Sequence, residues 1–139
     1  MYYQTNAAKV RAFMKIFGQE VKEYPEFPNR ETLDLRLELI QEEVAELIAG
    51  ASIRDLENVA KELTDILYVT YGMGASLGID LDACFTEVHR SNLSKLENGK
   101  VIYREDGKVM KGKNYTPPDM KRPLAYTNMI GQPLSLIHI

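Results

Sequence analysis

The sequence predicts an all-α domain of four helices, packed into a bundle that a second copy of the chain completes. Apolar residues recur at helical spacing in four successive segments between residues 6 and 99. Capping residues or glycines mark the ends of these segments. A chain of 139 residues, 45% of them hydrophobic, suits one small domain. We assign this domain to residues 1–122 and treat residues 123–139, apolar without a clear period, as a non-native or disordered tail.

The first two helices are predicted from their apolar stripes and caps. The first begins with Asn6 as its cap and ends near Tyr24, where prolines follow. The second covers residues 33–49, with Thr32 as its N-cap and Gly50 as its stop. The core stripe of the second helix is Leu33, Leu37, Ile40, Val44, Leu47 and Ile48.

The third helix begins after Ser52 and ends at Gly78. The fourth starts at Asp80 or Asp82 and continues to residues 98–99. The helical period stops there, and lysines alternate with glycine, proline and tyrosine over the next twenty residues. The C-terminal extension is therefore predicted to be irregular, with a short hairpin in which residues 101–103 face residues 109–110.

Composition excludes several classes of protein. No run of about 18 apolar residues predicts a membrane span, and residues 1–10 lack a signal-peptide pattern, so we expect a cytoplasmic protein. One cysteine, Cys84, and two histidines provide neither an internal disulfide nor a zinc cage, so any metal must be held by oxygen. A net charge of −3 does not favour a nucleic-acid partner.

The charges are divided unevenly along the chain. Residues 1–88 contain 8 basic and 16 acidic side chains, whereas residues 89–139 contain 9 basic and 4 acidic ones. An acidic body with a basic extension suits a site for the metal complex of a polyanion. The alternative is unrelated surface charge with a solubilising tail.

Acidic side chains gather on one side of the second predicted helix. Glu42, Glu43 and Glu46 lie within about 100° of one another on the helical wheel. No lysine or arginine occurs between residues 37 and 53, so no base lies within a helical turn of these acids in that stretch. Like charges at this spacing repel, so a group outside the helix should compensate them.

The third predicted helix carries a second acidic pair, Glu62 and Asp65. Apolar residues surround Glu62 on the helical wheel, and burying a carboxylate without a partner is costly. The short connection makes the two helices antiparallel, which brings both acidic sets together. Such a cluster requires divalent cations, and hard oxygen ligands select Mg²⁺ or Mn²⁺.

Two other interpretations of these acids are an ordinary ion pair and a di-iron site. Asp65 has Lys61 one helical turn away, so an ordinary surface ion pair is an alternative. A di-iron site is disfavoured because neither histidine stands three residues after a glutamate.

The order EExxE followed by ExxD resembles the signature of the all-α nucleoside triphosphate pyrophosphohydrolases. That superfamily includes MazG, the dimeric dUTPases and phosphoribosyl-ATP pyrophosphohydrolase. Residues 67–72, 78–80, 85–95 and 106–118 resemble the MazG-like subgroup that contains bacterial dUTP diphosphatases. The resemblance covers residues 6–120.

The resemblance implies an enzyme of nucleotide-pool house-cleaning. It would use Mg²⁺ to hydrolyse dUTP, or another non-canonical nucleoside triphosphate, to the monophosphate and pyrophosphate. The implied metal ligands and catalytic residues are Glu42, Glu43, Glu46, Glu62 and Asp65. The implied substrate-binding residues are Asn92 and Lys95 on the fourth helix, and Lys111, Lys113 and Tyr115 in a basic flap.

Two alternatives to this function stay open, and a partner subunit is expected in each. Phosphoribosyl-ATP hydrolysis in histidine synthesis is the enzymatic alternative, and a non-catalytic nucleotide-binding dimerisation module is the other. Short helices with apolar residues on more than one face bury little alone, since Leu35 and Leu39 fall near the acidic strip. We therefore expect a homodimer or a dimer of dimers.

Overall fold

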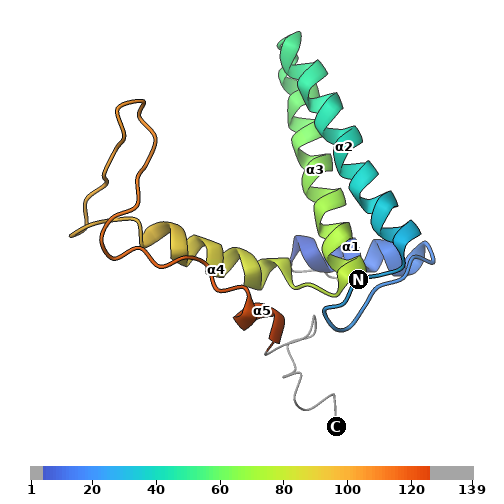
Figure 1. Cartoon of the computed structure of the whole chain (residues 1–139). Helices are drawn as coiled ribbons and strands as arrows, with labels where there is room; N and C mark the ends of the chain where they lie inside the picture. The colour runs from blue at the N-terminus through green and yellow to red at the C-terminus, as the bar shows by residue number, and fades with distance from the viewer. Residues whose placement is uncertain (1–4, 126–139) are drawn as a thin grey trace.

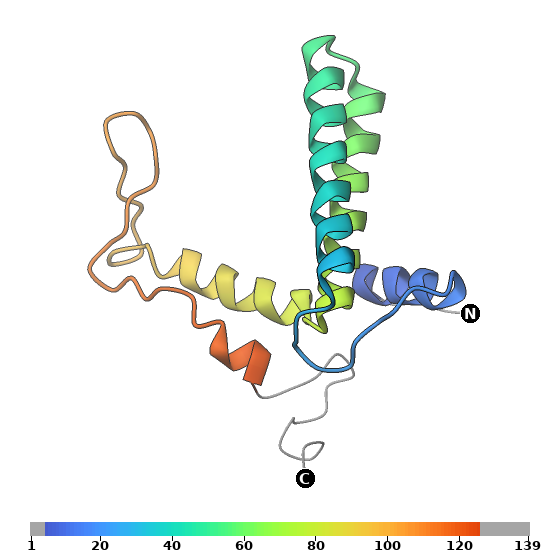
Figure 2. The same cartoon turned by 45° about the vertical axis from the view of Figure 1, so that its right-hand side comes forward.

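The computed structural model describes residues 5–125, and every regular element in this part of the chain is a helix. This confirms the predicted all-α class. Two long helices form an antiparallel hairpin, and a short helix crosses its base (Figure 1). A fourth helix leads away on the other side and carries a loop, forming a separate arm (Figure 2). The helices are α1 (Asn6–Ile16), α2 (Arg30–Ser52), α3 (Leu56–Leu77), α4 (Leu81–Leu93) and α5 (Lys121–Ala125).

The α2–α3 hairpin is the largest packed unit. Its helices have 23 and 22 residues, so each is about 33 Å long. Only residues 53–55 connect them, and the Asp55 side chain caps α3 by accepting a 3.1 Å hydrogen bond from the Asn58 backbone N–H. Gly50 lets the helices approach closely, because a Cβ there would lie 2.4 Å from Asn58 Nδ2. The tip of the hairpin is therefore narrow and well defined.

The core lies at the base of the hairpin, where α1 crosses α3. Val10 and Met14 of α1 are buried against Ala75 of α3. Val21, in the loop after α1, and Tyr71 of α3 pack against this cluster. This core is small, so one copy of the chain buries few of the apolar side chains within residues 5–125.

Arg36 links three segments at the base of the hairpin. This α2 side chain is buried, and its guanidinium donates to Ser76 Oγ of α3 at 2.9 Å and to Gln19 Oε1 of the α1–α2 loop at 3.0 Å. A Cβ at position 72 would lie 2.9 Å from its Nη1 atom, so Gly72 provides the space. Burial lowers the pKa of Arg36. Neutral hydrogen-bond partners thus hold a desolvated cation and connect α2 to α3.

Gly78 ends α3 for two reasons. Its φ of 68° lies in the left-handed region, which glycine adopts without steric cost. A Cβ at this position would also lie 2.0 Å from the Tyr24 carbonyl oxygen. The loop approaches this closely because the Glu26 N–H donates to the Leu77 carbonyl at 2.9 Å. The predicted stop at Gly78 is therefore confirmed.

The first helix is shorter than predicted. It ends at Ile16, not near Tyr24, and Thr5 rather than Asn6 caps it by accepting a hydrogen bond from the Ala8 N–H. Gly18 causes the early end, because its φ of 74° turns the chain and its N–H donates to a carbonyl of the last helical turn.

The second helix is longer than predicted at both ends. Asn29 is the N-cap in place of Thr32, accepting a 2.8 Å hydrogen bond from the Thr32 N–H. Gly50 lies inside the last turn, and the helix continues to Ser52 because this glycine serves helix packing rather than termination. Asp80, one of the two predicted starts of α4, is its N-cap.

The fourth helix ends at Leu93, several residues before the predicted end. Asn98 and Gly99 adopt positive φ values of 52° and 72°. The flanking residues, Glu97 and Lys100, exchange two backbone hydrogen bonds of 2.9 Å. An Asn-Gly pair favours this tight turn, and a helix does not continue through it.

The extension contains the predicted hairpin as a loop without regular strands in the described residues. Tyr103 and Val109 form an isolated antiparallel bridge, with a turn at Gly107, whose φ is 85°. Helix α5 spans the boundary predicted at residue 122, and residues 126–139 of the predicted tail lie outside the described part.

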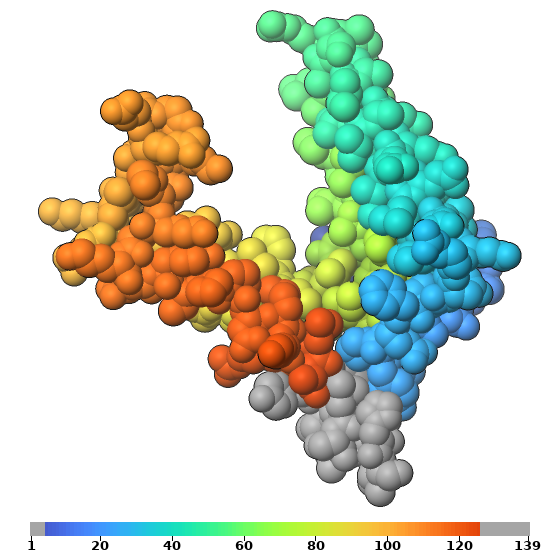
Figure 3. All heavy atoms as spheres, viewed as in Figure 1, coloured from blue at the N-terminus to red at the C-terminus, as the bar shows by residue number. Residues whose placement is uncertain are grey.

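Part of the predicted apolar stripe on α2 is exposed in one copy of the chain. The exposed fractions are 44% for Leu37 and 61% for Ile48. Leu67 on α3 and Phe85 on α4 are also exposed, with fractions of 56% and 74%. Figure 3 shows the hairpin and the α4 arm standing apart above their junction. Within residues 5–125, no helix combines the length and apolarity needed to span a membrane.

We expect Gly78→Ala to destabilise the fold more than Gly18→Ala. Both positions have positive φ near a helix end, which costs alanine about 1–2 kcal/mol. A Cβ has open space at Gly18, whereas at Gly78 it overlaps the Tyr24 carbonyl, so at least twice that cost is expected. Chemical denaturation measures both free energies of unfolding. Equal losses would contradict the close approach.

Candidate metal centre

Three carboxylates meet halfway along the α2–α3 hairpin. Oxygen atoms of Glu43 on α2 and of Glu62 and Asp65 on α3 all lie within 4.8 Å of one another. Glu62 is 4% exposed, and the other two residues are half-buried. Antiparallel packing across a short connection therefore brings together acids that are about twenty residues apart in sequence, as predicted.

Crowding of the carboxylates changes their protonation. The neighbouring Glu62 carboxylate is the main cause that raises the pKa of Glu43 to about 7, with burial and the charges of Glu46 and Asp65 adding to it. Closeness to Glu62 also raises the pKa of Glu46. Glu62 is desolvated, but interactions with Glu43 and Lys61 offset this, and its pKa is lowered. Full ionisation of the cluster at neutral pH is therefore unfavourable without a compensating cation.

The chemistry of the donor atoms fits a hard divalent cation. Buried polar atoms normally have hydrogen-bond partners, but neither Oε2 of Glu43 nor Oε2 of Glu62 receives a hydrogen bond. Both atoms belong to carboxylates that meet in the cluster. Oxygen-rich sites of this kind suit Mg²⁺ or Mn²⁺, with water completing the coordination. The three residues that would hold such an ion are Glu43, Glu62 and Asp65.

The other two predicted ligands are placed differently. Glu46 is exposed, one turn after Glu43 and near enough to Glu62 for each carboxylate to affect the other. Glu42 is exposed and lies outside the three-residue group. The helical wheel explains this, because adjacent positions on α2 point about 100° apart. Ligand roles for all five acids stay predictions.

Lys61 places the alternative ion pair inside the predicted metal site. Its Nζ lies 2.8 Å from Asp65 Oδ2 and 3.2 Å from Glu62 Oε1, and these two carboxylates raise the pKa of Lys61. The alternative ion pair with Asp65 therefore exists within the acid cluster. Sequence reasoning considered this pair but missed the contact of Lys61 with Glu62, the adjacent residue.

Asn92 and Lys95 lie at the end of α4 that is distant from the hairpin (Figures 1 and 2). Asn92 is exposed, and its carbonyl accepts a hydrogen bond from the Lys95 N–H. Lys95 in turn accepts a 2.9 Å hydrogen bond from the Gly112 N–H through its carbonyl. Within one chain, these two residues are thus not brought to the acids.

The predicted basic flap also belongs to the α4 arm. The Lys111 ammonium lies 4.7 Å from the centre of the Tyr115 ring, a cation–π contact. Lys113 is exposed, and its Nζ lies 3.7 Å from a carboxylate oxygen of Glu97. The flap therefore folds on itself and on the end of α4, and no contact with the acid cluster forms within the described residues.

Sequence comparison agrees with the helical hairpin and its acids. The family model described as phosphoribosyl-ATP pyrophosphohydrolase matches residues 10–92, which include all five predicted metal ligands and Asn92. The chain belongs to the phosphoribosyl-ATP pyrophosphohydrolase family. This confirms the superfamily inferred from the EExxE and ExxD pattern, without singling out the dUTP diphosphatase subgroup.

A viral protein is a second relative. The chain is 38% identical over 97 residues to "Uncharacterized protein L479" of Acanthamoeba polyphaga mimivirus. The match covers 67% of this chain and 36% of the viral protein, so the chain spans about a third of that relative's length.

Hydrogen bonds hold residues 116–119 against α4, and we call this arrangement the clamp. The Arg90 guanidinium donates to Thr116 Oγ1 and to the Pro117 carbonyl, and pairs with Glu87 at 2.8 Å. Glu87 Oε2 also accepts a 2.7 Å hydrogen bond from the Asp119 N–H. The sequence indicates no contact of Glu87 with Asp119, because the two residues lie 32 positions apart along the chain.

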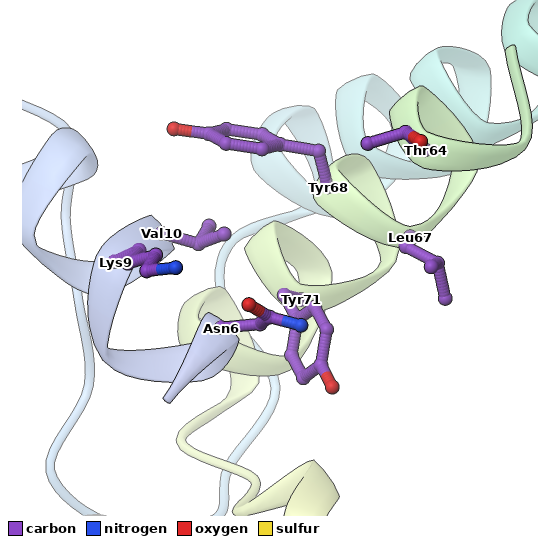
Figure 4. Close-up of a pocket in the computed structure, with 7 residues that line it drawn as sticks. All are labelled: Asn6, Lys9, Val10, Thr64, Leu67, Tyr68 and Tyr71. Atoms are coloured by element: carbon purple, nitrogen blue, oxygen red, sulfur yellow. The ribbon is translucent and has the colours of Figure 1, made fainter. Parts of the chain in front are cut away.

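A small pocket lies between α1 and α3, separate from the acids. Its volume is about 120 Å³, and its lining is mostly apolar. Figure 4 shows that its residues come from these two helices. Those from α3 lie about 120–180° from Glu62 around the helix, on the side away from the acids. The lining residues are Asn6, Lys9, Val10, Thr64, Leu67, Tyr68 and Tyr71.

We expect the clamp to release in acid. Hydrogen bonds from Arg90 and the Asp119 N–H lower the pKa of Glu87 from 4.5 to about 2. A lowered pKa in the folded state stabilises the clamp above pH 4.5, and this stabilisation is lost as the pH falls towards 2. Hydrogen exchange, corrected for intrinsic rates, should show that the backbone N–H groups of Thr116 and Asp119 lose protection over this range.

Glu87→Gln should lower that protection at pH 7 and remove its dependence on acid. Glu105→Gln, at an exposed acid of the same arm, is the matched control and should change neither. Equal protection of the wild type at pH 3 and pH 7 would show that the clamp does not depend on ionised Glu87.

Proposed function

We propose that the chain is a divalent-metal-dependent pyrophosphohydrolase that converts a nucleoside triphosphate to its monophosphate and pyrophosphate. The observation that carries this proposal is the buried Glu62 carboxylate, whose Oε2 accepts no hydrogen bond although it meets Glu43 and Asp65. An acid cluster of this kind needs a cation, and the family match supports phosphoanhydride chemistry. Mg²⁺ is the proposed ion, and Mn²⁺ would suit the same oxygens.

The proposed reaction adds water across one phosphoanhydride bond. The water oxygen joins the phosphorus that stays with the nucleoside, the bridging P–O bond breaks, and pyrophosphate leaves. Bound Mg²⁺ supplies charge neutralisation for the phosphate oxygens and makes water more acidic. The part of the protein is to hold Glu43, Glu62 and Asp65 at a fixed separation on two rigid helices.

The proposed substrate is dUTP or another non-canonical deoxynucleotide, which fits a house-cleaning role in the cytoplasm. This choice rests on the resemblance of residues 67–95 to the MazG-like subgroup. The family match favours a second candidate, phosphoribosyl-ATP, at least as strongly. Both substrates contain the same triphosphate, so the acid cluster would serve either one.

The proposed assembly is a homodimer, alone or as a dimer of dimers. Exposed apolar side chains on α2, α3 and α4 support it, because surfaces of this kind favour burial against a partner. The separation of the α2–α3 hairpin from the α4 arm supports this assembly further (Figure 2). A second copy could bring its own Asn92 and Lys95 towards the acids, which one chain does not do.

Glu43→Gln should lower the turnover rate about a hundredfold or more and leave the helical content unchanged, because it removes one charge from the proposed metal site. The assay separates monophosphate plus pyrophosphate from diphosphate plus phosphate, with dUTP, canonical triphosphates and phosphoribosyl-ATP as substrates. EDTA should abolish the release of pyrophosphate.

Glu57→Gln is the matched control, since it makes the same change at an exposed acid on α3. Faster turnover of phosphoribosyl-ATP than of dUTP would select the second candidate. Metal binding without any product would favour a non-catalytic nucleotide-binding module. Wild-type activity in the Glu43→Gln variant would rule out its metal role.

Sedimentation equilibrium should show a dimer at micromolar concentration. Phe85→Glu should shift this equilibrium towards monomers. The Phe85 side chain is 74% exposed in one copy, and a charge in its place would be costly to bury against a partner. Thr86→Glu, at the next and already polar position of α4, should have a smaller effect. A stable wild-type monomer at that concentration would contradict the proposed assembly.

A further inference from the structure

Lys61 occupies a distinctive place beside the acid cluster. Its ammonium pairs at once with Glu62 Oε1 and Asp65 Oδ2, two carboxylates of the three-residue group. Among the ion pairs of residues 5–125, it is the base that these acids share. The Lys61 ammonium therefore takes over part of the role of a metal ion, because it compensates the negative charge of these carboxylates.

The compensation by Lys61 is incomplete. A single ammonium carries one positive charge, whereas three carboxylates meet within 4.8 Å. Oε2 of Glu43 and Oε2 of Glu62 remain buried without a hydrogen bond. These two atoms form the part of the cluster that Lys61 leaves unpaired, so the arrangement still favours a second, more highly charged cation.

The two side chains of the Lys61–Glu62 ion pair differ in their exposure to water. The Lys61 side chain is 64% exposed, whereas the Glu62 side chain is 5% exposed. The ammonium can therefore move into water with little loss of burial, whereas the Glu62 carboxylate is held inside the cluster. A divalent ion that approached Glu62 and Asp65 would meet the ammonium at the same carboxylates, and two cations repel at that separation.

We propose that Lys61 is a displaceable counter-ion that neutralises Glu62 and Asp65 in the metal-free protein and leaves them when a divalent metal binds. This inference rests on the metal site of the proposed function and adds regulation to it. Lys61 stabilises the metal-free hairpin and competes with the metal, so it sets the metal concentration at which the site fills. Its role is to position and neutralise, since it contacts the ligands rather than a substrate.

The test is a calorimetric titration of the full chain with Mn²⁺. The chain is first treated with EDTA, and the EDTA is then removed. Lys61→Gln should bind Mn²⁺ about five- to tenfold more tightly than the wild type, because the competing charge is gone. Without metal, the same variant should unfold at a lower temperature. Lys61→Arg keeps the charge and should stay close to the wild type.

Lys22→Gln is the matched control. Lys22 also pairs with two carboxylates, Glu20 at 3.3 Å and Glu26 at 2.7 Å, but not with any acid of the cluster. It changes the net charge equally, so its Mn²⁺ affinity should equal that of the wild type. An equal gain in both variants would attribute the effect to overall charge and overturn the proposal.

Glu62→Gln separates a failure of this proposal from a failure of the metal site. If Glu62→Gln weakens Mn²⁺ binding while Lys61→Gln binds like the wild type or more weakly, the metal site stands and the counter-ion role is wrong. If the wild type and Glu62→Gln bind Mn²⁺ equally, or neither binds, the metal site itself is wrong and the counter-ion proposal falls with it.

Discussion

The repulsion between carboxylates across the α2–α3 hairpin is the constraint on which the rest of the structure depends. Charges of one sign within 4.8 Å favour opening of the hairpin, and the Glu62 side chain, 5% exposed, gains little relief from water. The two helices nevertheless stay together, so the contacts along the hairpin outweigh this repulsion. The protein thereby holds the acids ready for a cation before one arrives, which spares the cost of assembling them at the moment of binding.

Close contacts on both sides of the acids keep them in place. Arg36, Glu43 and Gly50 follow one another at intervals of seven residues on α2, so they share one face and are separated by about 10 Å each. Arg36 bonds to Ser76 at the base, and Gly50 meets Asn58 near the tip. Glu43 is therefore fixed midway between two close contacts of α2 with α3, rather than near a frayed helix end.

Much of the hairpin could be predicted from the sequence, because apolar period, caps and acid spacing are all local signals. The stop at Gly78 and the meeting of Glu43 with Glu62 and Asp65 are examples. Gly50 was interpreted wrongly since glycine ends helices and also admits close packing, and only the partner helix decides which applies. The contact of Glu87 with Asp119 was missed for the same reason, because it depends on a fold that returns the chain to α4.

The buried guanidinium at the base of the hairpin has an evolutionary consequence. Arg36 fills the space above Gly72 so closely that a methyl group there would lie 2.9 Å from its Nη1. A larger residue at position 72 would push the end of this guanidinium away from Ser76 and Gln19, and the loss of Arg36 would leave both without this donor. We therefore expect substitutions at these two positions to depend on each other, although the residues lie 36 positions apart along the chain.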